Sequence, residues 1–437
     1  MANATHAAPV TTNDRIETID VIRGFALLGI LLMNIVGMGM LSAAYFHPLV
    51  GANGAQAIPL DLHLWYFTEL FAEGAMRALF SMLFGAGILL FTTGTRAKSA
   101  VLHYKRTFWL MMFGMFDAFV LLWSGDILVV YAVCGAILYL GRNASTARLF
   151  TAATATLLLM AVFHWSIEWA FTDSRVAAVE RGANPQSANI TDADSAELEA
   201  RAELWIDFAA ESAPNAELVD FELTQRRSSY LSAFKWNLPQ AQKQVFFALP
   251  TLLLWDALLM MLFGMALYKA GVLTGARSTV FYRNLMIMGL TFGVAINYWE
   301  TTRTQATNYD ALATFGFSQI TYDLGRMGLA LGYIGLLGWV VANDWLGGTR
   351  RRLAAVGRMA LTNYLMHSLI ALILFTGAGF ALVGNLHRWQ LYPIVVAVWI
   401  FQLWFSPWWL KRHSMGPLEA LWRRLTYGGK RDVAQHA

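Results

Sequence analysis

Cysteine is almost absent from this chain, since Cys134 is the one cysteine among 437 residues. A single cysteine excludes an intramolecular disulfide and any CxxC-type metal site, and we predict no metal site. The chain also lacks a P-loop, a GxSxG elbow, an HExxH helix and a GxGxxG turn between a strand and a helix. These absences argue against ATPase, hydrolase, metalloprotease and dinucleotide-binding functions, and against primary active transport by this chain alone.

Charged residues are also scarce: they make up 14% of the chain, whereas hydrophobic residues make up 57%. The mean hydropathy of +0.47 is too high for a soluble globular protein. The pI of about 9.1 does not indicate nucleic-acid binding, because the basic residues cluster in short loops between apolar runs. Composition therefore predicts a membrane protein, with lipid as a partner and nucleic acid excluded.

Long continuous apolar runs predict an all-α, polytopic membrane helical bundle. We expect about ten transmembrane helices, near residues 18–40, 65–93, 106–122, 126–141, 148–172, 245–270, 281–300, 322–343, 353–374 and 390–410. Lysine and arginine gather in alternate loops and in the C-terminal tail. By the positive-inside rule, both termini are expected in the cytoplasm.

The chain divides around one large insertion. We predict a polar tail (1–17), a first bundle of about five spans (18–172), an acidic extracytoplasmic insertion (173–243), a second bundle of about five spans (244–426) and a tail (427–437). Within the insertion, 197–208 and 216–230 could form amphipathic helices. The insertion is either a solvated spacer or a lid that binds an acceptor, and the sequence leaves both open.

Two short segments of the bundles echo each other, Met82-Leu-Phe-Gly85 and Met261-Leu-Phe-Gly264. Four-residue echoes are common in helices rich in leucine and glycine, so this pair only suggests an internal repeat. The small residues near Gly85 suit close helix packing.

Polar side chains inside the apolar runs are costly in lipid and are usually paired or functional. In the first run, Asp20 and Arg23 lie one turn apart and can pair, and Asn34 lies about 16 Å deeper at the helical rise. In the second, Glu69, Glu73 and Arg77 are spaced to share a helix face, with an in-helix pair predicted between Glu73 and Arg77. The same polar cluster is expected to include Ser81, Asp117, Asp126, Asp256, Arg326, Asn363, Tyr364 and His367.

Several of these residues have structural alternatives. Asp126 opens a span and could cap its N-terminus. Asp256 requires a cation, and Arg326 is the candidate partner. His367 could be a satisfied buried histidine. His47 lies in the loop after the first run and could act as a general base near neutral pH, with His63 as a weaker rival.

The order of these motifs resembles the YeiB-like family, a bacterial membrane group that carries domain of unknown function 418. The matching pieces are Asp20-Val-Ile-Arg23-Gly24 with Asn34, Glu73-Gly-Ala-Met-Arg77 with Ser81, Trp123-Ser-Gly125-Asp126 with Tyr131, Gly357-Arg358 with Asn363-Tyr364, and Gly416-Pro417 through Thr426. They run from residue 20 to 426, so the resemblance covers nearly the whole chain. It implies a multi-pass protein of the bacterial inner membrane.

The Arg-Gly opening is also similar to that of transmembrane acyltransferases, including the heparan-α-glucosaminide N-acetyltransferases. This similarity implies transfer of an acetyl group from cytoplasmic acetyl-CoA to a sugar across the membrane. It also implies catalytic roles for Asn34 and His47, which would stabilise the oxyanion and act as the base or carry the acyl group. The phosphates of acetyl-CoA or another acyl-CoA would be attracted by basic residues, Arg96, Lys98, Arg106 and Arg358.

The sequence therefore favours a transmembrane acyltransferase whose partners are acyl-CoA and an extracytoplasmic glycan or small molecule. A proton-coupled transporter is the alternative, in which Glu69, Glu73, Arg77, Asp256 and Arg326 would line the route. A third hypothesis is a scaffold in envelope biogenesis. A homo-oligomer is compatible with each.

Overall fold

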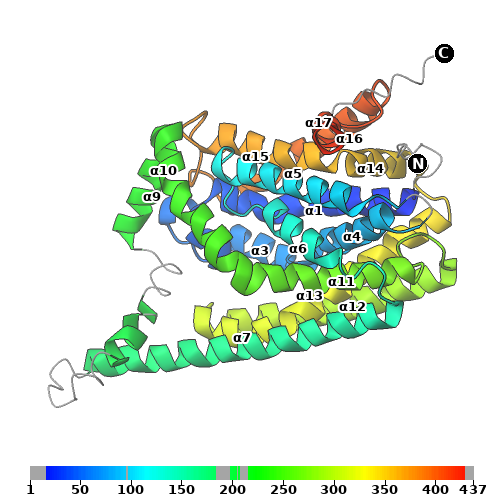
Figure 1. Ribbon diagram of the computed structural model, residues 1–437. Coiled ribbons are helices and arrows are strands. Elements are labelled where there is room, and N and C mark those ends of the chain that lie inside the picture. The colour runs from blue at the N-terminus through cyan, green and yellow to red at the C-terminus, as the bar shows by residue number, and fades with distance from the viewer. Residues whose placement is uncertain (1–15, 95–96, 184–196, 204, 207–214, 429–437) are drawn as a thin grey trace.

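The computed structural model describes residues 16–94, 97–183, 197–203, 205–206 and 215–428 (Figure 1). Their regular structure is helical, apart from one isolated β-bridge between Val50 and Gln56. Most helices run side by side in one bundle. Figure 1 places α9 and α10 at one end of the bundle and α14 and α17 towards the other. The predicted all-α class is confirmed.

The first half of the chain forms a series of helices, the first of which begins at Glu17. They are α1 (Glu17–Gly39), α2 (Ala43–Phe46), η2 (Ala52–Gly54), α3 (Pro59–Phe71), α4 (Ala75–Thr92), α5 (Ala100–Phe119), α6 (Leu128–Leu138) and α7 (Thr146–Ala183). The second half begins with the helices at the end of the insertion. They are α9 (Ala216–Ser228), α10 (Tyr230–Gln242), the π-helix η3 (Lys243–Leu253), α11 (Leu254–Lys269), α12 (Thr279–Ala306), α13 (Ala311–Ala342), α14 (Gly347–Arg358), α15 (Ala360–Phe375), α16 (Arg388–Leu410) and α17 (Pro417–Tyr427).

Seven helical segments of the described residues are long and apolar enough to cross a membrane, or eight if α14 and α15, bent by 80°, count as one span. The predicted number of ten is not confirmed. The difference lies in the predicted spans 106–122 and 126–141, which fall on α5 and α6. The α6 helix has 11 residues, about 16 Å at 1.5 Å per residue, whereas the hydrocarbon core is about 30 Å thick.

The long second span is broken between α3 and α4. Gly74, at the break, has a φ of 64°, a backbone angle that residues other than glycine rarely adopt. A Cβ there would also lie 2.7 Å from the Tyr322 hydroxyl. The break interrupts the helix face that Glu69, Glu73 and Arg77 were predicted to share.

The core is built around α1. Its early turns cross α14 so closely that there is no room for a side chain at the glycines of the crossing. A Cβ at Gly24 would lie 2.0 Å from the Leu353 carbonyl oxygen, and a Cβ at Gly357 would lie 2.0 Å from the Asp20 carbonyl oxygen. The side chain of Trp399 on α16 donates to the Leu28 carbonyl at 2.9 Å. Ile22 and Leu27 are fully buried. These contacts hold the N-terminal half of α1 in place inside the bundle.

The insertion is continuous with the helices on either side of it. The α7 helix continues past residue 172 to Ala183, and α10, η3 and α11 form one helical segment from Tyr230 to Lys269. The predicted helix 216–230 corresponds to α9. The other, 197–208, lies partly outside the described residues. The insertion therefore has no clear boundary at either of the predicted ends.

The α9 helix docks on the C-terminal end of α1. Arg226 donates to the carbonyls of Met38 and Met40, each at 2.8 Å, and to Glu222 at 2.8 Å. Glu222 also accepts from the Ser42 amide at 2.9 Å and from its hydroxyl at 3.0 Å. A guanidinium is well suited to the carbonyls that a helix leaves unpaired at its C-terminus. The α9 helix is therefore packed against the end of α1, and α9 and α10 are together called the cap.

Candidate functional site: two cavities joined at Tyr131

A cavity of about 520 Å³, the cap cavity, lies beneath α9 and α10. Its lining includes Asn34 of α1 and Ser42 just before α2, Glu73, Arg77 and Ser81 from the second span, Asp256 from α11, and Trp236, Asn237 and Gln240 from α10. The sequence predicted that Asn34, Glu73, Arg77, Ser81 and Asp256 would belong to one polar cluster. The structure brings these five residues to one cavity.

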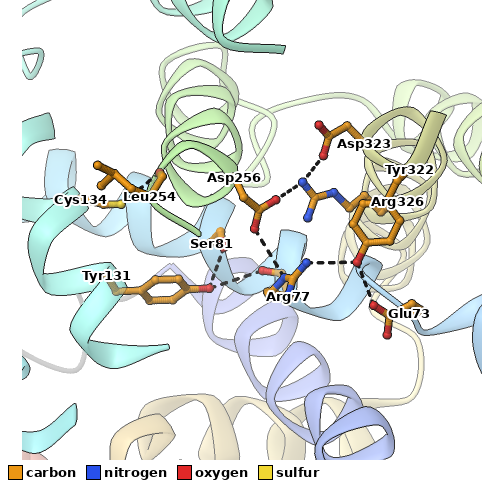
Figure 2. Close-up of polar contacts among 10 residues, drawn as sticks. All are labelled: Glu73, Arg77, Ser81, Tyr131, Cys134, Leu254, Asp256, Tyr322, Asp323 and Arg326. Carbon is orange, nitrogen blue, oxygen red and sulfur yellow. Dashed lines mark hydrogen bonds and ion pairs between the residues drawn. The ribbon is translucent and has the colours of Figure 1, made fainter. Parts of the chain in front are cut away.

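A chain of charged and hydroxyl groups runs along the wall of the cap cavity (Figure 2). Tyr322 donates to Glu73 at 2.8 Å and accepts from Arg77 at 3.1 Å. The direct pair predicted between Glu73 and Arg77 is therefore bridged by Tyr322, because the helix breaks at Gly74 and separates the two side chains. Arg77 instead lies 3.6 Å from Asp256.

The predicted pairing of Asp256 with Arg326 is confirmed. Arg326, which is 2% exposed, forms ion pairs with both Asp256 and Asp323. Two arginines and three carboxylates thus form one connected network within the bundle. Pairing in this way is what permits charged groups to lie in a membrane interior.

His47 lies apart from this network. It is not among the residues that line the cap cavity, and its ring is 6.5 Å from that of Tyr309. Burial lowers the pKa of the His47 imidazole, which keeps the ring neutral near pH 7. The histidine can therefore accept a proton, but it does not line the cavity that contains Asn34. Glu69 is likewise not among the lining residues, and His63 is exposed and contacts the Pro59 carbonyl at 2.7 Å.

The remaining predicted polar residues form a separate buried group around α5, α6 and α15. Asp126 accepts from the Val129 amide at 3.0 Å, as a helix cap does, and from Tyr364 at 3.3 Å. Asp117 is fully buried. Asn363 donates to Ser406 at 3.1 Å, and His367 contacts Gln402 at 3.2 Å. These contacts support the structural alternatives for Asp126 and His367.

A second cavity of about 270 Å³, the arginine cavity, lies at the end of the bundle where α1 begins. Its lining includes Arg23, Arg106 and Arg358, together with Glu419 and Trp422 of α17. Arg23 pairs with Asp20 at 3.0 Å, as predicted. The deeper wall is apolar and includes Phe80, Leu83, Phe84, Leu110 and Leu128.

In this cavity, the guanidinium of Arg106 makes cation–π contacts with two aromatic rings. Its guanidinium lies 4.7 Å from the Phe91 ring and 4.4 Å from the Trp422 ring, and neither ring neutralises its charge. Glu419 accepts from the Thr362 amide and hydroxyl at 3.0 and 2.6 Å, and burial raises the pKa of its carboxyl. Of the other predicted phosphate-binding residues, Lys98 lines neither cavity and Arg96 lies outside the described residues.

Four residues important to these cavities were not predicted as site residues. Tyr322 and Asp323 lie within one turn of Arg326, and this spacing could have revealed them. Tyr131 stood in a family motif but was not assigned to the site. Arg226 gave no signal, because its partners on α1 are more than 180 residues away in the chain.

The described helices define a polytopic membrane protein that contains the cap cavity and the arginine cavity. Residues 267–429 match the family described as "Protein of unknown function (DUF418)". The chain is 29% identical to the uncharacterized protein YeiB of Escherichia coli strain K12, over 94% of this chain and 96% of YeiB. It is 26% identical to the uncharacterized protein YxaH of Bacillus subtilis strain 168, over 98% of both chains. No solved structure matches it. The match to this family model and the similarity to YeiB and YxaH confirm the predicted resemblance to the YeiB-like family with domain of unknown function 418.

Proposed function

We propose that the protein is a transmembrane acyltransferase of the bacterial inner membrane. It would move an acyl group, such as acetyl, from cytoplasmic acyl-CoA to a glycan or small molecule on the other side. The observation that carries this proposal is the pair of cavities, which lie towards opposite ends of the bundle and have Tyr131 in both linings. A donor and an acceptor that enter from opposite faces could meet there.

The arginine cavity suits the donor. With both termini in the cytoplasm, as the distribution of basic residues predicts, this cavity faces the cytoplasm. Arg106 and Arg358 would bind phosphate groups through charge-assisted hydrogen bonds. The apolar wall formed by Phe80, Phe84 and Leu128 would pack against the uncharged part of the donor.

The cap cavity suits the reaction. The acceptor hydroxyl or amine would attack the thioester carbonyl carbon, and Asn34 would donate a hydrogen bond to the resulting oxyanion, worth about 3–4 kcal/mol in comparable sites. Glu73, oriented by Tyr322, would take the acceptor proton. The carbon–sulfur bond would then break, and the coenzyme would leave as a thiolate that is protonated to the thiol. We prefer Glu73 to His47 because Glu73 lines the cavity with Asn34.

Binding of the donor provides the first test. Purified protein in detergent, titrated with acetyl-CoA in a calorimeter, should show saturable binding. Arg106→Ala should weaken it about tenfold, because one charge-assisted contact is worth about 1.5 kcal/mol. Arg283→Ala is the matched control, since Arg283 is exposed on α12 and outside both cavities. If neither acetyl-CoA nor a longer acyl-CoA binds saturably, the proposal is wrong.

Catalysis provides the second test. Asn34→Ala and Glu73→Gln should lower kcat by about 100-fold or more while acyl-CoA still binds. His47→Ala should have a much smaller effect. The reverse result, with His47→Ala inactive and Glu73→Gln active, would assign the base to His47. Full activity in all three variants would show that the site has been misassigned.

A proton-coupled transporter is the alternative function, and the network around Arg77 favours it. Buried acids and arginines in a connected chain are typical of proton routes. In addition, the break at Gly74 in one half is matched by the π-helix η3 in the other, relative to the echoing segments Met82–Gly85 and Met261–Gly264. Reconstituted into liposomes with a pH-sensitive dye, a transporter would move protons with its substrate, and Asp256→Asn would abolish this movement. An acyltransferase would not.

A further inference from the structure

Tyr131 occupies a special position among the described residues, because it is the one residue that lines both cavities. Every other lining residue belongs to the cap cavity or to the arginine cavity alone. Tyr131 is 2% exposed and lies on α6, a helix of 11 residues. A single side chain thus forms a shared wall between the two cavities.

The two ends of the Tyr131 side chain have different surroundings. Its ring is stacked near Phe80, with centroids 5.9 Å apart, and tilted against Phe84 at 5.1 Å. Both of these phenylalanines line the arginine cavity. Its hydroxyl contacts the Ser81 hydroxyl at 2.6 Å and donates to the Arg77 carbonyl at 3.5 Å, and both residues line the cap cavity (Figure 2).

These contacts also determine what could pass. The Ser81 hydroxyl and the Arg77 carbonyl hold the ring across the boundary, and the arginine cavity provides space next to it. The apolar neighbours Phe80, Phe84 and Leu128 would make passage of a charged group costly, because burying an unpaired charge is strongly unfavourable. A phosphate would remain near Arg106 and Arg358, whereas an uncharged, unbranched chain could extend past the ring.

We propose that Tyr131 is a gate that determines specificity: held by Ser81, it separates the cavities, and when its ring moves it admits a narrow, neutral, unbranched chain. The ligand class is an amphiphile with an anionic head in the arginine cavity and an uncharged arm directed towards the cap cavity. Identification of that arm with the acyl-bearing arm of acyl-CoA rests on the proposed function. The gate itself does not.

Thiol labelling tests the gate without any assay of activity. The native cysteine is removed by Cys134→Ala, and Ala360→Cys places a thiol in the arginine cavity. Oriented membrane vesicles are treated with a maleimide on a long polyethylene glycol chain, which is neutral, linear and unable to cross the membrane. With Tyr131 in place, labelling should occur from the face of the arginine cavity. In Tyr131→Ala, labelling from the cap face should rise at least tenfold.

Two further variants separate the gate from a general loosening of the bundle. Phe91→Ala removes a ring that lines the arginine cavity and packs near His103 and Arg106, so it should leave labelling one-sided. Ser81→Ala keeps the Tyr131 ring but removes its hydroxyl partner, so labelling from the cap face should rise severalfold. Unchanged labelling from the arginine-cavity face checks the fold of each variant.

The gate is overturned if the thiol is labelled from both faces while Tyr131 is intact. It is also overturned if labelling stays one-sided in both Tyr131→Ala and Ser81→Ala. Neither result depends on acyl-CoA. Conversely, failure of acyl-CoA to bind would end the proposed function and leave the labelling pattern as evidence for a gate on another amphiphile's path.

Discussion

Gly85 of α4 and Gly264 of α11 each lie against the backbone of the other's helix. A Cβ at Gly85 would lie 2.2 Å from the Met261 carbonyl oxygen, and a Cβ at Gly264 would lie 2.0 Å from that of Met82. The echoing segments Met82–Gly85 and Met261–Gly264 therefore pack reciprocally. Arg77 and Asp256, at equivalent places before these segments, also contact each other. All three contacts keep nearly the same separation in sequence, so the two helices run in the same direction, as in a parallel repeat.

This crossing predicts that alanine is not tolerated at either glycine. Gly264→Ala should lower the free energy of unfolding by about 1–3 kcal/mol, because the backbones must separate to admit a methyl group. Gly87→Ala on α4, the other helix of this crossing, is the control, since nothing lies within 4 Å of its Cβ position. Helix propensity should make Gly87→Ala neutral or about 1 kcal/mol more stable. Thermal unfolding in detergent would measure both, and equal effects would contradict the crossing.

The ion pair between Asp256 and Arg326 should be important for stability because Arg326 is almost fully buried. Asp256→Asn leaves a cation without its full compensation, which costs about 3–5 kcal/mol in buried pairs. Asp173→Asn is the control, because its pair with Arg201, at 2.6 Å, has both side chains 38% exposed. An exposed pair contributes about 0–1 kcal/mol. A comparable loss of stability in the two variants would argue against the buried network.

The cap should depend on Arg226. Arg226→Ala removes charge-assisted hydrogen bonds to Met38, Met40 and Glu222, each worth about 1.5–3 kcal/mol. Hydrogen exchange measured by mass spectrometry should therefore become faster across α9 and α10, while α4 and α11 keep their protection. Asp220→Ala, an exposed change on the same helix, should leave exchange in α10 unaltered. If Arg226→Ala also leaves it unaltered, other contacts hold the cap.

His47 should make stability depend on pH. Burial lowers its pKa below the ordinary value of 6.5, so the unfolded chain binds the proton more readily than the folded one. The resulting stability is present above about pH 6.5 and is lost as the pH falls through the folded pKa. His47→Gln should flatten this part of the curve of unfolding temperature against pH. The other titrating groups are the same in both proteins, so identical curves would show that the imidazole is not buried in the folded protein.

Much of the arrangement around α1 and α11 could be predicted from sequence. Asp20 with Arg23 is a local pair, set by the helical repeat, and it forms as expected. Asp256 with Arg326 is a distant pair, but each charge lies in an apolar run and requires a partner of opposite sign. The expected contact between Glu73 and Arg77 was wrong because the glycine between them, Gly74, adopts a left-handed conformation and breaks the helix.

The sequence by itself determined that this is an all-helical membrane protein and which charges had to be paired, because hydropathy and the cost of charge in lipid act on every local segment. Only the tertiary structure decided that Tyr131 lies between two cavities, that Arg226 closes one of them, and that Asn34 lines that cavity without His47. These relationships depend on how helices far apart in the chain cross, where they break and where they leave space. No local periodicity encodes that packing.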